Sequence, residues 1–206
     1  MRDEWYSDNR DLVKWGVLLK LAELHNMATI LQVAYYHPPR WDEKGIDIDG
    51  NAYPLPQEVV SHFRDIKKIK AMRSNARVRV LVDPFQDRDR YLQRVLMAIR
   101  SLPRPAIVFL DPDTGLEPLG KAKPVHVLEK ELCEIWHALR RGDLLALYQH
   151  QIREDRWVEK KRAQFENAIG LDPGGSKLAQ GRAIARDVAF FFSRRLDSEE
   201  TVKVSR

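Results

Sequence analysis

Acidic and imidazole side chains directly follow short apolar segments at several points in this sequence. The clearest example is the run Ala106 to Leu110, which ends at Asp111-Pro112-Asp113. Three more such side chains end other β-prone segments, namely His37, Asp83 and His150. Carboxylates and imidazoles can transfer protons, orient an amine or hold a metal ion. These five side chains are therefore the candidate functional groups.

The spacing of apolar residues predicts that strands and helices alternate along the chain. Helical spacing extends over residues 8–24, 56–72, 88–100, 125–139 and 154–169, and β-prone runs cover residues 28–36, 78–82, 106–110, 144–148 and 188–192. This alternation indicates a three-layer α/β/α fold with a doubly wound, mostly parallel sheet. We expect one domain over residues 1–196, a polar tail over residues 197–206, and the last strand at an antiparallel edge.

The predicted topology determines where the candidate side chains meet. In a parallel sheet all carboxyl ends lie along one edge, which is where open α/β folds bind ligands. We therefore expect one crevice lined by His37, Asp83, Asp111, Asp113 and His150. The alternative is structural, because an Asp-Pro pair is also a good strand terminator and turn former.

Three segments resemble known methyltransferases. Asp111-Pro112-Asp113-Thr114 resembles the post-strand motif D/N-P-P-Y/F of class I S-adenosylmethionine-dependent methyltransferases that act on nucleic acid. The segment from Leu139 to His150 is similar to the helix, glycine turn and fifth strand of that family. The opening helix, SDNRDLVKWGVLLKLAELHN, is similar to the N-terminal segment of ribosomal-RNA adenine methyltransferases. Combined with FLDPDTGLE, this opening also resembles a group of uncharacterised bacterial proteins.

The resemblance implies a methyltransferase-like, Rossmann-like fold and methyl transfer from S-adenosylmethionine to nucleic acid. It implies that Asp111 orients the acceptor. Asp113 and His150 are then the further catalytic residues, and His37 and Asp83 bind the cofactor. The sequence departs from the family after its first strand, where His37-Pro38-Pro39 stands in place of a glycine-rich turn. Thr114 also replaces the aromatic residue on which a flipped base stacks.

Two other functions fit the same residues. A metal-dependent phosphoryl hydrolase or nuclease could hold Mg²⁺ with Asp83, Asp111 and Asp113, because Mg²⁺ prefers carboxylates and water. A binding module without catalysis could use the long loop from Arg40 to Pro56, with Trp41 in its contact surface. In that case the polar strand ends are structural turns.

The charge of the chain suggests a polyanionic partner. Its 206 residues carry a formal net charge of +5, and excess Lys and Arg accelerate encounter with phosphates. The segment RDIKKIKAMRSNARVR contains the candidate nucleic-acid-binding residues Lys67, Lys68, Lys70 and Arg73. A solvated helix face with basic residues near its C-terminus is the alternative.

The remaining composition indicates a soluble, cytoplasmic protein. The charged start MRDEWYSDNR has no apolar core typical of a signal peptide. No run approaches the roughly 20 apolar residues of a membrane span. The single cysteine, Cys133, cannot form an internal disulfide or a thiolate metal cage. The sequence does not indicate an oligomeric state.

Overall fold

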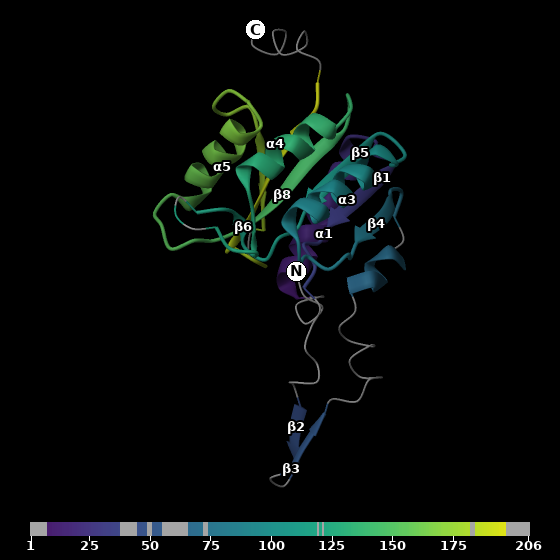
Figure 1. Cartoon of the computed structure of the whole chain (residues 1–206). Helices are drawn as coiled ribbons and strands as arrows, with labels where there is room; N and C mark the ends of the chain where they lie inside the picture. The colour runs from purple at the N-terminus through teal and green to yellow at the C-terminus, as the bar shows by residue number, and fades with distance from the viewer. Residues whose placement is uncertain are drawn as a thin grey trace.

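The centre of the protein is a six-stranded sheet in the order β4-β1-β5-β8-β10-β9 (Figure 1). The computed structural model describes residues 8–37, 45–48, 51–54, 66–71, 74–118, 120, 122–181 and 184–196. The strands are β1 (Thr29–Val33), β4 (Arg77–Leu81), β5 (Ala106–Leu110), β8 (Leu144–His150), β9 (Lys177–Gln180) and β10 (Val188–Arg194). Strands β4, β1, β5 and β8 pair in parallel, whereas β10 is antiparallel to both of its neighbours.

Helices cover both faces of this sheet. Helix α1 (Asn9–Leu24) packs on one face, where Leu18 and Leu21 share a core with β-strand residues such as Ile30 and Phe109. The opposite face is covered by α3 (Arg88–Arg100), α4 (Glu129–Ala138) and α5 (Trp157–Ala168). The predicted three-layer α/β/α architecture is therefore confirmed.

The chain winds in both directions from the middle of the sheet. It passes from β1 outward to β4, and α3 then returns it across β1 to β5. From β5 the strands continue toward the other edge. The strand order thus reverses between β1 and β5, which makes the sheet doubly wound and Rossmann-like, as predicted.

Several short elements lie outside the main alternation. The 3₁₀ helix η3 (Ile66–Ala71) lies on the α1 side, because Ile69 belongs to the same core as α1. Strands β2 (Gly45–Ile48) and β3 (Asn51–Pro54) form an antiparallel pair. Strands β6 (Gly115–Leu116) and β7 (His126–Val127) form a parallel pair.

Two predicted features differ from the structure. The last strand, β10, is antiparallel as expected, but β9 and not β10 forms the edge. Strand β9 is mostly exposed and has no apolar run, so its segment was predicted as loop. The predicted loop over residues 40–56 contains β2 and β3. Most of the predicted helix over residues 56–72, the side chain of Trp41 and the tail over residues 197–206 lie outside the described residues.

The buried face of helix α1 contains two charged residues. Its buried stripe contains Asp11, Lys14, Leu18 and Leu21, at helical spacing. Leu12, predicted on the apolar face, is 63% exposed. The stripe therefore delivers a carboxylate and an ammonium group to the sheet near the start of the helix. None of the described helices is long and apolar enough to cross a membrane.

Candidate functional site

A pocket of about 250 Å³ lies at the carboxyl ends of β5 and β8, beneath the start of α1. It is lined by Asp8, Arg10, Asp11, Lys14, Asp111, Pro112, Asp113, Thr114, Tyr148 and His150. The sequence predicted a crevice at this edge of the sheet, and Asp111, Asp113 and His150 do line one pocket. We call it the α1 pocket.

Strand alternation explains why these side chains share a face. Ile107 and Phe109 of β5 face α1, so Asp111, two residues further along the strand direction, continues on the same face. On β8 the same parity applies to Ala146, Tyr148 and His150. Because β5 and β8 pair in parallel with Leu110 opposite Leu147, these polar ends are adjacent.

A buried ion pair forms the floor of the α1 pocket. The Lys14 Nζ atom lies 2.9 Å from Asp111 Oδ1 and 2.8 Å from Asp11 Oδ1. Gln32 of β1 donates from Nε2 to Asp111 Oδ2 at 2.6 Å. The Lys14 ammonium also lies 4.9 Å from the centre of the Tyr148 ring. Two carboxylates and an aromatic face thus contact one cation, and the Gln32 amide binds one of these carboxylates.

The electrostatics of this floor keep Lys14 charged. Burial alone would lower the pKa of Lys14, but the Asp111 and Asp11 carboxylates outweigh burial and raise it above its ordinary value. Burial raises the pKa of Asp111, and the Lys14 ammonium opposes that rise. Asp111 is only 1% exposed. Its carboxylate is therefore held in place by Lys14 and Gln32.

A second charged group closes the side of the pocket. Arg10 donates from Nη2 and Nε to Asp187 Oδ2 at 2.6 and 3.0 Å. The Nε2 atom of His150 lies 3.1 Å from the same Asp187 oxygen. The hydrogen bond from Arg10 lowers the pKa of Asp187, and the carboxylate raises that of Arg10. This contact joins α1, the end of β8 and the segment before β10.

The loop that carries Asp113 is held in place by the end of β8. The backbone N–H of His150 donates to the Thr114 carbonyl at 2.9 Å. Gln149 Oε1 accepts from the Leu116 N–H at 2.9 Å, and Gln149 Nε2 donates to the Thr114 carbonyl at 3.0 Å. Gly115 has a φ of +117° and lies directly against the Gln149 amide. The pocket wall is thus built by contacts between strand ends.

Asp83 and His37 do not join this pocket, which corrects the sequence prediction. Asp83 follows β4 at a position that faces α3, since Leu81 packs in the core on that side. Its carboxylate pairs with Arg94 of α3. The centre of the His37 ring lies 5.8 Å from the centre of the Phe85 ring. The parallel strands all end on the same side of the sheet. Because side chains alternate along a strand, however, Asp83 and His37 lie on the face covered by α3 and not on the face covered by α1.

The proposed carboxylate set for a metal ion is consequently divided. Asp111 and Asp113 line the α1 pocket, whereas Asp83 is bound to Arg94. Among the described residues no group of three or more His, Cys, Asp or Glu side chains is arranged to hold a metal ion. The Mg²⁺ hypothesis therefore lacks its ligand set in this part of the chain.

The end of β1 does not fit a nucleotide cofactor held on a glycine-rich turn. At that position Ala34 is fully buried and Tyr35 is 2% exposed. The Tyr35 ring packs against Phe85 and Tyr91, with ring centres 5.3 Å apart in both cases. A cofactor turn needs room for the ligand to approach the backbone. Here aromatic rings fill that room, so we assign no role to S-adenosylmethionine at this position.

Three of the four basic candidates lie on η3. Lys67, Lys68 and Lys70 are exposed, whereas Ile66 and Ile69 are buried. Ile66 packs with Ala34, Val80 and Val82, which lie at or near the carboxyl ends of β1 and β4. Helix η3 therefore lies near the same sheet edge as the α1 pocket, and on the same face. Arg73 lies outside the described residues.

Sequence reasoning missed several polar residues of the α1 pocket and its surroundings, among them Arg10, Lys14, Gln32 and Asp187. Lys14 and Gln32 had a usable signal, because each occupies a position whose neighbours at the structural period are apolar. Lys14 precedes Leu18 by one helical turn, and Gln32 lies within an apolar strand. Arg10 and Asp187 had no such signal, because 177 positions separate the two partners.

Solved structures with a similar chain path include the following two. One is the crystal structure of a DUF574 family protein from Streptomyces avermitilis, with 11% identity, 91% of this chain and 82% of that chain covered, and a TM-score of 0.42. The other is a "putative methyltransferase" from Thermobifida fusca, with 15% identity, 91% and 80% covered, and a TM-score of 0.39. No family model and no curated protein matches the chain. At these TM-scores neither similarity carries a functional assignment.

Proposed function

We propose that this protein binds nucleic acid and receives an amine-bearing base in the α1 pocket. The observation that carries the proposal is the pairing of a small, acceptor-rich pocket with an exposed row of lysines near the same edge and on the same face of the sheet. Methyl transfer to such a base, which the resemblance implies, is not part of this proposal, because it would require a separate site for the methyl donor.

The chemistry of the pocket suits a group that donates N–H. Asp8, Asp11, Asp111 and Asp113 line it, against the permanent cations Arg10 and Lys14. Lys14 and Arg10 are already paired with carboxylates, so the excess charge is negative. Carboxylates accept hydrogen bonds and never donate when ionised. An exocyclic amine of adenine, cytosine or guanine is a matching donor.

The size of the pocket favours one part of a larger molecule. Whole small-molecule ligands occupy clefts of roughly 300–1,000 Å³. The α1 pocket measures about 250 Å³. It therefore accommodates a single ring-sized group whose remainder stays outside, as with a base of a single strand.

The polymer backbone would be held by the lysines of η3. An acidic pocket repels phosphates, so the phosphates need a separate basic surface. Lys67, Lys68 and Lys70 provide three exposed ammonium groups within one short helix. Each phosphate that a lysine neutralises releases counterions, which makes binding depend on salt concentration.

The proposal is tested by fluorescence anisotropy with labelled single-stranded RNA and DNA at several salt concentrations. We expect weaker binding by the triple variant Lys67→Glu/Lys68→Glu/Lys70→Glu. The negative slope of log K against log salt should become shallower by about 0.7 for each lost phosphate contact. The matched control is Arg100→Glu/Lys123→Glu/Lys130→Glu, which changes net charge equally at exposed positions on α3, on α4 and just before β7. Equal losses in both triple variants would indicate non-specific attraction alone.

The pocket is tested separately by Asp113→Asn. Loss of one charged acceptor should weaken binding of amine-bearing bases about tenfold, without changing the salt slope. Oligouridine, which has no exocyclic amine, should be insensitive to this substitution. Asp155→Asn, at an exposed position away from the pocket, is the control. If no single strand binds, or if Asp113→Asn affects oligouridine equally, the proposal is wrong.

A further inference from the structure

The carboxyl end of β1 is closed by three aromatic side chains. Tyr35, Phe85 and Tyr91 are 2%, 8% and 3% exposed, and we call them the aromatic cluster. The Phe85 and Tyr91 ring planes meet at 89° with centres 4.9 Å apart, and the Tyr35 and Phe85 planes meet at 61°. Such edge-to-face contacts are the preferred packing of aromatic rings.

The backbone N–H group of Tyr35 already has a hydrogen-bond partner within the protein. Tyr35 has a φ of +46°, in the left-handed region where glycine is the usual residue. Its N–H donates to the Tyr91 hydroxyl at 2.8 Å. The backbone thus keeps a glycine-like conformation, but its donor points to a side chain of the same protein. A ligand approaching this turn would meet an aromatic ring and a satisfied N–H group.

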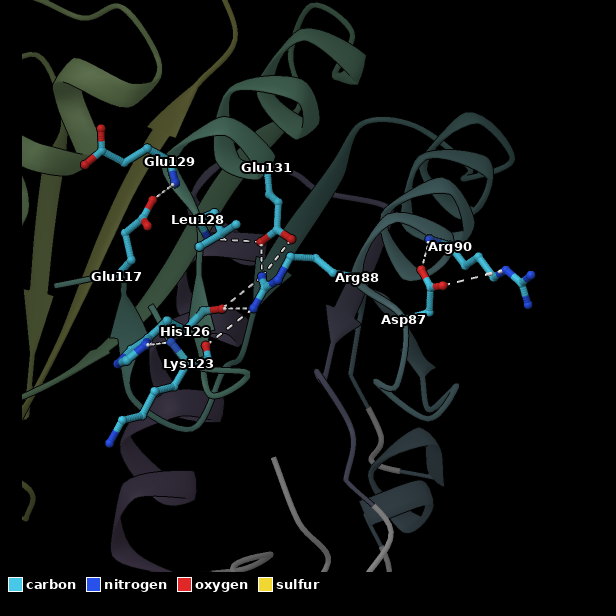
Figure 2. A network of polar contacts seen from close by, with 9 residues as sticks. All are labelled: Asp87, Arg88, Arg90, Glu117, Lys123, His126, Leu128, Glu129 and Glu131. Carbon is cyan, nitrogen blue, oxygen red and sulfur yellow. Dashed lines mark hydrogen bonds and ion pairs between the residues drawn. The ribbon is translucent and has the colours of Figure 1, made fainter. Parts of the chain in front are cut away.

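Arg88, which contacts Phe85 of the aromatic cluster, belongs to a charged network. Figure 2 shows its contacts with Glu131 and His126. The Arg88 Nη1 atom lies 2.7 Å from Glu131 Oε1, and Glu131 is 2% exposed. The same guanidinium donates to the His126 carbonyl at 3.3 Å and lies 4.9 Å from the centre of the Phe85 ring. These contacts join the start of α3 to the start of α4. Opening the cluster would therefore disturb the anchoring of two helices.

The pocket that the described residues form beside the cluster is small. A pocket lined by Pro84, Gln86, Asp87, Arg90, Tyr91 and Arg94 measures about 160 Å³. Clefts that hold whole ligands measure roughly 300–1,000 Å³. This pocket is therefore too small for a whole nucleoside cofactor.

We propose that the aromatic cluster has replaced the methyl-donor site of this fold, so that the protein recognises its ligand without binding S-adenosylmethionine. The proposal is independent of the nucleic-acid partner suggested above, because it concerns the end of β1 and not the α1 pocket. It makes the protein a recognition module built on an enzyme-like scaffold.

Calorimetry with the full chain tests the absence of donor binding. S-Adenosylmethionine and S-adenosylhomocysteine should give no saturable heat up to millimolar concentration, with and without a single-stranded oligonucleotide. Saturable binding in the micromolar range, in either condition, would overturn the proposal. Oligonucleotide binding is measured on the same preparation, so failure of one proposal is seen apart from failure of the other.

Amide exchange measured by NMR tests the closure directly. The Tyr35 amide should exchange slowly and stay unchanged when S-adenosylmethionine is added. Tyr91→Phe keeps the ring but removes the hydroxyl that accepts from Tyr35, so exchange of this amide should rise about tenfold. Tyr148→Phe, which removes a hydroxyl outside the cluster, should leave it unchanged. Fast Tyr35 exchange in the unaltered protein, or equal exchange in both variants, would show that the cluster is open.

Discussion

Lys14 is the residue that makes a buried cluster of acids tolerable. Its ammonium lies between Asp11 and Asp111, and both the lysine and Asp111 side chains are at most 5% exposed. A carboxylate in a low-dielectric site is costly unless a cation and hydrogen bonds compensate for lost water. The pocket floor is therefore one unit, in which the effect of each group depends on the others.

Replacing Lys14 with methionine should destabilise the fold by about 3–5 kcal/mol, because two buried carboxylates would lose their cation. Methionine keeps most of the volume, so the loss reports on charge. The free energy of unfolding in urea measures it. Lys20→Met is the control: Lys20 pairs with Glu23 at the surface, with both side chains over 60% exposed, and should change stability by less than about 1 kcal/mol. Similar losses in both variants would contradict the buried-charge account.

Gly115 occupies a position that no other residue can adopt without displacing its neighbour. A Cβ there would overlap the Gln149 amide, and φ is +117°. Gly115→Ala should destabilise the protein by about 2–3 kcal/mol. It should also break the hydrogen bond that Gln149 donates to the Thr114 carbonyl and the one that it accepts from the Leu116 N–H. Thermal unfolding measures the change.

The matched control for this substitution is Gly16→Ala. Gly16 lies within α1, with no atom within 4 Å of its added Cβ. Because alanine is the better helix former, Gly16→Ala should stabilise by about 0.5–1 kcal/mol. A Gly115→Ala variant as stable as the unaltered chain would mean that the loop carrying Asp113 is not held as described.

At the scale of elements, Glu166 and Arg162 of helix α5 form hydrogen bonds with the segment before β9. Glu166 accepts from the Ser176 hydroxyl at 2.6 Å and from the N–H groups of Gly174 and Ser176, each at 3.0 Å. Burial alone would raise the pKa of Glu166, but these hydrogen bonds lower it below its ordinary value. The edge strand β9 is exposed and lacks an apolar run, so this contact helps to position it.

The lowered pKa of Glu166 gives a pH-dependent contribution to stability. The ordinary value is 4.5, so the ionised carboxylate stabilises the fold above about pH 4.5, and this contribution is lost as the pH falls through the lower folded-state pKa. The difference in unfolding free energy between the unaltered chain and Glu166→Gln should therefore be largest near neutral pH and shrink below pH 4.5. Glu159→Gln, at a side chain 60% exposed, should show little difference at any pH. A difference for Glu166→Gln that is independent of pH would contradict this account.

Element positions were the more predictable part of the fold. The predicted run over residues 106–110 coincides with β5, and the predicted helix over residues 88–100 coincides with α3. Both have a strong apolar period. Strand β9 could not be predicted, because its pairing with β10 and not its own composition makes it a strand. Leu12 was misassigned because the rotation of α1 about its axis depends on what lies opposite.

At the scale of the whole molecule, the carboxyl ends of the parallel strands lie in two different environments. The carboxyl ends of β5 and β8 form an open, acceptor-rich pocket beneath α1. The carboxyl end of β1, one strand away, is packed with aromatic rings on the side of α3. The proposed binding pocket and the aromatic cluster thus lie on opposite faces of the sheet.

The sequence alone determined the α/β class, the polar ends of the strands and the presence of Asp111, Asp113 and His150 at one edge. These follow from local periods and from the rule that parallel strands end together. Only the tertiary structure decided that Asp83 pairs with Arg94, that Lys14 neutralises Asp111, and that Tyr35, Phe85 and Tyr91 close the end of β1. The reason is physical: partners 97 residues apart, as Lys14 and Asp111 are, are selected by crossover side, side-chain parity and packing, which no local pattern encodes.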